Sequence, residues 1–487
     1  VKVECMKVED KPHFAYRGGM LDVCRHIFSV EEVKKYIDIL AMHKMNRFHW
    51  HLTEDQGWRI EIKKYPNLTK VGSMRKETLV GLQTKKNNNY DGKPYGGFFT
   101  QEQVRDIVRY AAERYIEVIP EIDMPGHMIA ALASYPELGC TKGPYEVRTR
   151  WGISKDVLCA GRESTFEFIE GVLDEVAALF PSKFIHIGGD ECPKHRWKVC
   201  PECQQRMKEE GLKDEHELQS YFMKRVENYL VTKHGRSIIG WDEILEGGVS
   251  KTATVMSWRG TKGGIKAAKM GNYVIMTPHH YCYLDYANTS DRVKNGEPIC
   301  GGRNGKRPIT LRTAYSFDPY AELNEKERTY IMGVQGNMWT EYVPNFNHVQ
   351  HMVLPRLAAI DVVDFENGWV GLFILGGQAD MALQEEWGED TDKAVTYYTE
   401  QNKKGIDALK QYFVDGVVPE VDVYTVIMPP YVEEDIVIDE EVTSEDIVIE
   451  EGLVEDVTDA IEGAAAAVED VIADMTEVVT EATEAQG

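Results

Sequence analysis

The hydrophobic pattern of the first 360 residues alternates between short apolar runs and longer segments with helical spacing. Such spacing predicts helices at Val30–His43, Gln101–Arg114, Phe166–Leu179 and Leu218–Lys233. The short runs predict eight strands, at Met20–Val23, Asn46–Leu52, Ile116–Ile122, Phe184–Ile187, Ser237–Trp241, Thr254–Trp258, Tyr273–Thr277 and Tyr330–Val334. Strands that alternate with helices in this way predict an α/β fold, and eight of them predict a (β/α)₈ TIM barrel. The Gly-rich connection Ala287–Ser316 is expected to be an excursion over one barrel face.

The chain after the barrel changes in composition. Residues 363–428 are expected to form an unassigned segment of helical or mixed structure, and residues 429–487 an acidic low-complexity extension. Within that extension, the sequence EDIVIDE at 434–440 returns as EDIVIEE at 445–451, and apolar residues from Val454 onward keep heptad spacing. Helices this acidic would repel each other, so the composition favours a solvated tail over a coiled coil. A basic partner for the tail is a further hypothesis.

The formal net charge of −25 is concentrated in this tail. No Lys or Arg follows Lys410, and 23 of the 80 acidic residues lie in 411–487, so the first 410 residues carry 57 acidic and 55 basic side chains. A nearly neutral body argues against nucleic-acid binding, which requires a basic face. No apolar run reaches the roughly 18 residues that a membrane span needs, and no signal peptide is visible in this chain.

Polar and aromatic side chains gather where the predicted strands end. In strand order they are Arg17 and Asp22; His49 to Asp55; Glu121, Asp123 and His127; Asp190 and Glu191; Trp241 to Glu243; Trp258; Tyr283 and Asp285; and Trp339 and Glu341. Active sites of TIM barrels form at the carboxyl ends of the strands, with residues from several strands. The sequence therefore predicts a site at this end of the barrel.

The predicted site suits a sugar. Trp241, Trp258 and Trp339 could supply flat aromatic walls, which match the apolar face of a sugar ring. No Gly-rich loop with a Lys is present to favour a phosphate substrate. A metal hydrolase stays open through residues such as His49 and His51, although packing on one strand face explains these two as well.

The two consecutive acids raise a geometric problem. Glycosidases normally need two carboxyl groups on either side of the bond that breaks. Asp190 and Glu191 are neighbours, so their side chains leave the backbone in different directions and cannot easily flank one anomeric carbon. This arrangement suggests that the substrate brings its own nucleophile.

The nine cysteines give a weak metal signal. Cys200 and Cys203 form one CxxC pair with Cys192 nearby, but no second pair is visible, so we expect thiols or a local disulfide here and no metal. Cys140 and Cys159 flank one segment and could pair with each other. An odd count leaves at least one thiol unpaired within the monomer.

Six motifs carry a resemblance to a known family. They are YRGGMLDVCRH at 16–26, FHWHLTEDQGW at 48–58, PEIDMPGH at 120–127, HIGGDE at 186–191, GWDE at 240–243 and NMWTE at 337–341. Together they resemble the β-N-acetylhexosaminidases of glycoside hydrolase family 20, over about residues 14–359. The resemblance implies substrate-assisted catalysis, in which a group of the sugar replaces the usual carboxylate nucleophile.

The resemblance implies roles for the catalytic residues. Glu191 would be the general acid and then the base, and Asp190 would orient the 2-acetamido group of the substrate, whose oxygen attacks the anomeric carbon. Tyr283 would hydrogen-bond that oxygen. His127 resembles a support for Glu191, with either Glu54 or Asp55 behind it.

The resemblance also implies a substrate and its binding residues. The substrate would be an oligosaccharide or glycoconjugate with a terminal β-linked N-acetylhexosamine, removed by an exo-acting, retaining enzyme that needs no cofactor. The walls of the acetamido pocket would be Trp241, Trp258 and Trp339, and the sugar hydroxyls would be held by Arg17, Asp285 and Glu341. Periplasmic, extracellular or lysosomal location is implied. An inactive sugar-binding barrel is the alternative from another class.

Two departures from the family pattern stand out. Many members carry a small α/β domain before the barrel, so Val1–His13 is expected to be a remnant of it, with the barrel at 14–362. After the helix expected at 348–359, the family pattern gives way to Ile360–Asp364 and a sequence without recognisable likeness.

Overall fold

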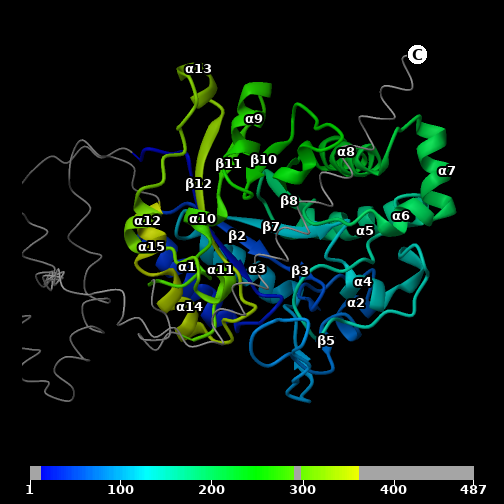
Figure 1. Ribbon diagram of the computed structural model, residues 1–487, viewed down its shortest axis with the longest axis horizontal. Helices are drawn as coiled ribbons and strands as arrows, with labels where there is room; N and C mark the ends of the chain where they lie inside the picture. Colours follow the sequence, from blue (N-terminus) through cyan, green and yellow to red (C-terminus); the bar gives the residue numbers. More distant parts are fainter. Residues whose placement is uncertain (1–11, 290–297, 361–487) are drawn as a thin grey trace, which may run out of the picture. The chain divides into compact units, whose positions relative to one another are not determined.

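The computed structural model describes residues 12–289 and 298–360, and within them eight parallel strands close into a barrel (Figure 1). The neighbours around the barrel are β1, β12, β11, β10, β9, β8, β7 and β2. Their bounds are β1 Tyr16–Asp22, β2 Arg47–His51, β7 Glu117–Met124, β8 Phe184–Gly188, β9 Ser237–Trp241, β10 Thr254–Ser257, β11 Val274–Met276 and β12 Ile331–Met338. The barrel closes where Tyr16 pairs with Gly333. The predicted TIM barrel and all eight of its predicted strands are confirmed.

The helices surround the barrel, and the four expected from periodicity are present. They are α1 Val30–Met42, α3 Gln101–Ala112, α5 Glu163–Leu179 and α8 Glu215–His234. The local sequence explains where α1 and α3 begin. Ser29 with Glu32, and Thr100 with Gln103, form capping boxes that satisfy backbone amide groups at the starts of these helices.

Shorter elements fill the connections. The other helices are α2 Asn67–Lys70, α4 Ile129–Ser134, α6 His195–Val199, α7 Pro201–Glu210, α9 Lys262–Met270, α10 His279–Cys282, α11 Gly301–Asn304, α12 Leu311–Tyr315, α13 Glu325–Arg328, α14 Phe346–Val353 and α15 Arg356–Ile360, with 3₁₀ turns η1 Pro136–Leu138 and η2 Asp242–Leu245. Two small hairpins pair β3 Thr53–Glu54 with β4 Gly57–Trp58, and β5 Met74–Arg75 with β6 Tyr95–Gly96. Helices α11 and α12 lie in the expected excursion Ala287–Ser316.

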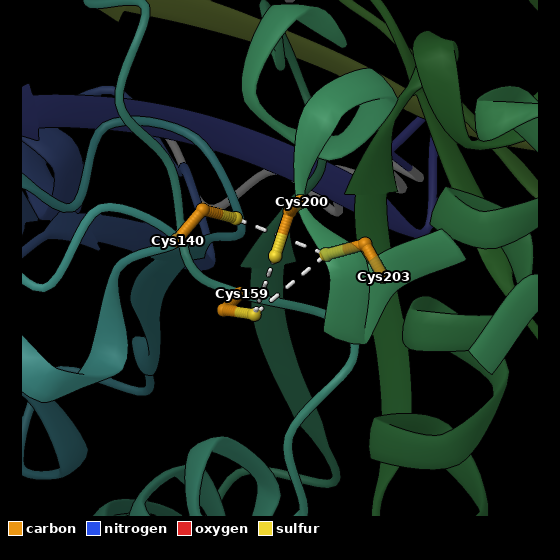
Figure 2. A group of neighbouring side chains, drawn as sticks. All are labelled: Cys140, Cys159, Cys200 and Cys203. Atoms are coloured by element: carbon orange, nitrogen blue, oxygen red, sulfur yellow. Dashed lines mark hydrogen bonds between the residues drawn. The ribbon is translucent and has the colours of Figure 1, made fainter. Parts of the chain in front are cut away.

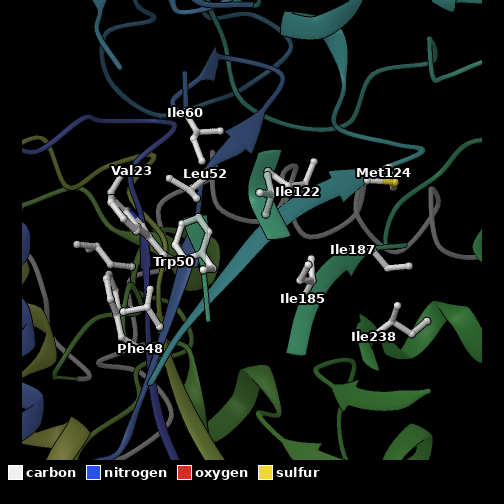
Figure 3. Packing of buried hydrophobic residues seen from close by; sticks show 14 of the residues in the cluster. Val23, Phe48, Trp50, Leu52, Ile60, Ile122, Met124, Ile185, Ile187 and Ile238 are labelled. Carbon is white, nitrogen blue, oxygen red and sulfur yellow. The ribbon is translucent and has the colours of Figure 1, made fainter. Parts of the chain in front are cut away.

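The strands separate two hydrophobic layers because successive side chains point to opposite faces. Phe48 and Trp50 of β2 belong to the large core between strands and helices (Figure 3). The ring of Trp50 contacts that of Phe99 at a centroid distance of 4.9 Å. His49 and His51 alternate with them and face the barrel interior. The barrel therefore has an apolar outside and a partly polar inside, and the polar inside leads up to the site.

Several expected segments cannot be compared. Residues 1–11 of the expected remnant, the barrel end at 361–362, and the segments 363–428 and 429–487 lie outside the described residues. Within the described ranges, no helix is both long and apolar enough to cross a membrane.

Candidate active site

A pocket of about 230 Å³ lies at the carboxyl ends of the barrel strands. Its lining residues are Arg25, Glu54, His127, Asp190, Glu191, Trp241, Trp258, Tyr283, Asp285, Tyr286, Trp339 and Glu341. The structure thus brings together ten of the twelve residues to which the family resemblance gave roles. They come from segments far apart in the chain, and only barrel closure explains why they meet.

The acid pair is held by an unusual turn after β8. Gly188 and Gly189 both have positive φ, of 67° and 99°, and Glu191 itself has φ of 43°. A Cβ on Gly188 would lie 1.7 Å from Oδ1 of Asp123, so only glycine fits. A non-glycine residue in the left-handed region is strained, and the surrounding structure must hold it. The turn directs the side chains of Asp190 and Glu191 into the pocket.

His127 links the acid pair to a buried carboxylate. Its Nδ1 lies 2.7 Å from Oε1 of Glu54, and its Nε2 lies 3.5 Å from Oε2 of Glu191 and 3.6 Å from Oδ2 of Asp190. Burial opposes protonation, but the charges of Glu54 and Asp190 outweigh it and raise the pKa of His127 well above its usual value. His127 is therefore a buried cation beside both acids. Of the two residues between which the sequence left the choice open, Glu54 contacts His127, and Asp55 does not line the pocket.

Asp190 differs from an ordinary surface carboxylate. Burial raises its pKa to about 6, against the opposing charge of His127. Among the described residues, its Oδ1 has no hydrogen-bond partner although it is buried. A buried acceptor left open in a pocket is suited to a donor from a ligand.

Four aromatic side chains form the walls. Trp258 and Tyr283 stack at a centroid distance of 6.0 Å, and Trp339 lies 5.9 Å from Trp241 and 6.0 Å from Tyr283. Trp258 donates its Nε1 hydrogen to Glu243 at 2.9 Å, which fixes the plane of the ring. Burial and the nearby Asp190 raise the pKa of Tyr283 well above its usual value, so its hydroxyl stays a donor.

Glu121 is the centre of a polar network below this pocket. It accepts a hydrogen bond from Nε1 of Trp241 at 2.8 Å and lies 2.9 Å from Nε2 of His49 and 2.5 Å from Nδ1 of His51. His186 approaches it at 3.0 Å. Burial opposes ionisation, but the surrounding imidazoles hold the pKa of Glu121 well below its usual value. The histidines that left a metal hydrolase open are thus engaged with a carboxylate that also orients Trp241.

The polar end of the pocket is organised by Arg25. Its guanidinium lies 3.0 Å from Oε2 of Glu54 and 3.9 Å from Oε1 of Glu341, and it covers the ring of Trp339 at 5.1 Å. Burial raises the pKa of Glu341, and burial with the Glu341 charge raises the pKa of Asp285. Within the described part of the chain, Oδ1 of Asp285 is buried without a hydrogen-bond partner. This end offers a fixed cation and open oxygen acceptors to hydroxyl groups.

Two predicted site residues lie elsewhere and need correction. Arg17 stands near the start of β1, where its side chain donates to the carbonyl oxygens of Phe14 at 2.7 Å and Lys44 at 2.9 Å. Its expected place is taken by Arg25, which follows the end of the same strand. Asp55 accepts from the amide of Ile129 at 3.1 Å and does not line the pocket. The prediction was wrong for Arg17 because this residue stands at the amino end of β1, whereas the site lies at the carboxyl ends of the barrel strands.

Two lining residues were missed. Arg25 lies in the quoted motif at 16–26, and its position three residues after β1 was the signal that could have found it. Tyr286 follows Asp285 in an irregular connection, and no pattern in the sequence marked it.

Comparisons with known proteins agree on one family. The family model described as glycosyl hydrolase family 20, catalytic domain, matches residues 14–370. A β-hexosaminidase of Porphyromonas gingivalis is 51% identical over 404 residues, which cover 80% of this chain and 49% of that protein. A β-hexosaminidase of Akkermansia muciniphila is 36% identical, over 75% of this chain and 71% of its own length.

Solved structures lead to the same family. A family 20 exo-β-N-acetylglucosaminidase of Vibrio harveyi, in complex with N-acetylglucosamine, aligns with a TM-score of 0.61 at 36% identity, covering 72% of this chain and 54% of that one. The chain spans about half the length of the first curated relatives, 49% of one and 57% of the next. The matched family model, the relatives and the closed barrel together show that this chain belongs to glycosyl hydrolase family 20.

Proposed function

We propose that this protein is an exo-acting β-N-acetylhexosaminidase, which removes terminal β-linked GlcNAc or GalNAc with retention of configuration. The observation that carries the proposal is the pair of Asp190 and Tyr283 inside the aromatic walls. A secondary amide presents one N–H donor and one carbonyl acceptor. The open, buried Oδ1 of Asp190 matches the donor, and the protonated hydroxyl of Tyr283 matches the acceptor. A 2-acetamido group would satisfy both.

The same pair supports a mechanism in which the substrate supplies the nucleophile. Glu191 donates its proton to the leaving oxygen as the glycosidic bond breaks. The acetamido oxygen attacks the anomeric carbon and closes an oxazolinium ring, while Tyr283 holds that oxygen in place. Asp190, as an anion, accepts from the amide N–H and stabilises the positive charge that grows there. Water, deprotonated by Glu191, then opens the ring from the other face, so two inversions give net retention.

His127 tunes this sequence of steps. As a cation held by Glu54, it favours the ionised form of Asp190, which burial alone would disfavour. With a pKa of about 6, Asp190 is ionised above that pH and loses its charge below it. We therefore expect activity to fall on the acid side as Asp190 becomes protonated.

The size and chemistry of the pocket support removal of a single terminal sugar. About 230 Å³ is below the roughly 300–1,000 Å³ of pockets that take drug-sized ligands. Arg25, Asp285 and Glu341 line its polar end and could bind the sugar hydroxyls. The aligned Vibrio harveyi enzyme is described as exo-acting and holds N-acetylglucosamine, and a Streptomyces plicatus β-hexosaminidase variant holds the product GlcNAc.

The proposal is tested with two chromogenic substrates and one variant. The wild-type chain should release p-nitrophenol from the 2-acetamido-2-deoxy-β-glucoside and not from the plain β-glucoside. Glu191→Gln should slow that release strongly because an amide cannot take the proton of the attacking water, although p-nitrophenolate leaves without help from an acid. Cleavage of the plain glucoside at a similar rate would contradict the need for the acetamido group. Binding of GlcNAc by a folded chain without any turnover would instead support an inactive sugar-binding barrel.

A further inference from the structure

Four cysteine side chains converge outside the pocket (Figure 2). Cys140 and Cys159 come from the connection between η1 and α5, and Cys200 and Cys203 stand at the start of α7. The Sγ atoms lie 3.8 Å apart for Cys140 and Cys203, 3.8 Å for Cys159 and Cys200, and 3.6 Å for Cys159 and Cys203. All four sulfur atoms lie within 4.8 Å of one another. Cys192, the neighbour of Glu191, is not part of the group.

These separations are those of a metal site. Four sulfur atoms placed tetrahedrally at about 2.3 Å from a zinc ion are separated by about 3.8 Å along each edge. A disulfide would bring two sulfur atoms to about 2.05 Å. These three distances fall near the tetrahedral edge, and the sulfur atoms of Cys159 and Cys203 each approach two others.

A cationic side chain lies beside the four cysteines. The guanidinium of Arg162 lies beside the group, where it donates to the carbonyl oxygen of Gly139 at 2.8 Å. Arg162 also pairs with Glu202, so its charge offsets only part of the net negative charge that four thiolates and one divalent ion would carry.

Close packing holds the two segments at this distance. A Cβ on Gly161 would lie 2.2 Å from the carbonyl carbon of Glu202, so the backbones on either side of the cysteines touch. Glu202 also pairs with Arg162 at 3.2 Å. The convergence of the four cysteines is thus built into both segments, and it does not depend on one mobile side chain.

We propose that Cys140, Cys159, Cys200 and Cys203 bind a structural zinc ion. Four thiolates in a tetrahedron leave no open position for substrate, which is the pattern of structural zinc sites. Three of the four cysteines are buried, as a closed site requires. The site lies apart from the pocket lining and takes no part in bond breaking.

The ion would clamp the two connections that carry the acid pair and its histidine. The first runs from β7 through His127 to Cys159, and the second from β8 through Glu191 to Cys203. Leu158, next to Cys159, donates its amide hydrogen to Pro125 at 3.0 Å and accepts from Nε1 of Trp197 at 2.9 Å. Zinc would therefore fix the relative position of His127 and Glu191 through their supporting loops.

Metal content of the full chain tests the proposal. Protein purified with reductant and without chelator should contain one zinc per chain by elemental analysis. Cys203→Ala should lose that zinc, and Cys282→Ala, which removes a buried thiol outside the group, should keep it. Loss of zinc should lower Tm by several degrees, since binding energy at such a site is folding energy. Wild-type protein without bound metal, or with zinc retained in Cys203→Ala, would overturn the proposal.

Cobalt substitution covers the case in which Cys203→Ala does not fold. Wild-type protein loaded with Co²⁺ should show the intense charge-transfer and visible bands of a tetrahedral centre with four thiolates. A spectrum typical of oxygen ligands would overturn the assignment, and so would iron in the purified wild-type protein. Because this readout does not use glycosidase activity, it stays separate from the test of the proposed function.

Discussion

Replacement of Glu54 by Gln tests what the negative charge of this buried side chain contributes, because the volume of the side chain stays nearly the same. In the structure, Glu54 contacts Nδ1 of His127 at 2.7 Å and Arg25 at 3.0 Å. Glutamine keeps nearly the same volume and still offers an oxygen to His127. It removes the negative charge that keeps the imidazole protonated. The perturbation therefore acts on the charge of His127 more than on its position.

The size of the effect follows from the distances to the acid pair. Two unit charges separated by the 3.6 Å between His127 and Asp190 attract by about 4–5 kcal/mol at an effective dielectric constant of about 20. Even a third of this interaction corresponds to about one pKa unit. Loss of the cation should raise the pKa of Asp190 above its present value of about 6. Since the proposed mechanism needs ionised Asp190, the acid limb of kcat/KM should move to higher pH.

The assay is the pH profile of kcat/KM, which reports the free enzyme. Glu54→Gln should shift the acid limb upward by about one unit and lower the maximum about 10–100-fold, the range known for carboxylates that support metal-binding histidines. Asp55→Asn is the matched control, since Asp55 contacts Ile129 and Arg148 outside the pocket. It should leave the acid limb in place. An unshifted limb in folded Glu54→Gln would refute the reasoning about His127.

Four further changes test separate parts of the proposed site and fold. Glu191→Gln should lower kcat by about 10²–10⁴-fold with a leaving group that needs protonation, measured on unactivated chitobiose. Tyr283→Phe should lower kcat only about 2–10-fold, the value of one hydrogen bond, and an unchanged rate would contradict its contact with the acetamido oxygen. Arg25→Lys should lower kcat/KM about tenfold or more because the planar fork is lost, while Arg17→Lys should not change it. Gly188→Ala should lower the free energy of unfolding by at least about 1–3 kcal/mol in denaturant titrations, because φ is positive and Asp123 occupies the space of a Cβ.

Most of the fold and of the candidate site could be predicted from the positions of the strands and from the residues at their ends. Apolar runs located the eight strands, and the barrel geometry then brought residues such as Glu191 and Trp339 together although they are far apart in the chain. Arg17 shows the limit of this reasoning, since a residue near a strand can lie at either end of it. The sequence could not show whether Glu54 or Asp55 contacts His127, because neighbouring residues on a short hairpin point in opposite directions and the sequence does not say which one faces the site.

The cysteine group shows a different limit. Only Cys200 and Cys203 have the spacing of a metal motif, and the lack of a second such pair in the sequence argued against zinc. Cys140 and Cys159 reach the same place because their connection folds back against α7, with the backbone of Gly161 touching Glu202. Tertiary contacts of this kind leave no periodic signal in a single sequence.

The most direct test of the proposed function varies the nucleophile that the substrate is expected to supply. Fluorine atoms placed on the 2-acetamido group withdraw electron density from its carbonyl oxygen and leave the sugar ring and leaving group unchanged. We expect kcat/KM on p-nitrophenyl β-glycosides to fall steeply from the acetyl through the fluoroacetyl and difluoroacetyl to the trifluoroacetyl compound. Equal rates across the series would contradict attack by the acetamido oxygen and would require a nucleophile from the protein.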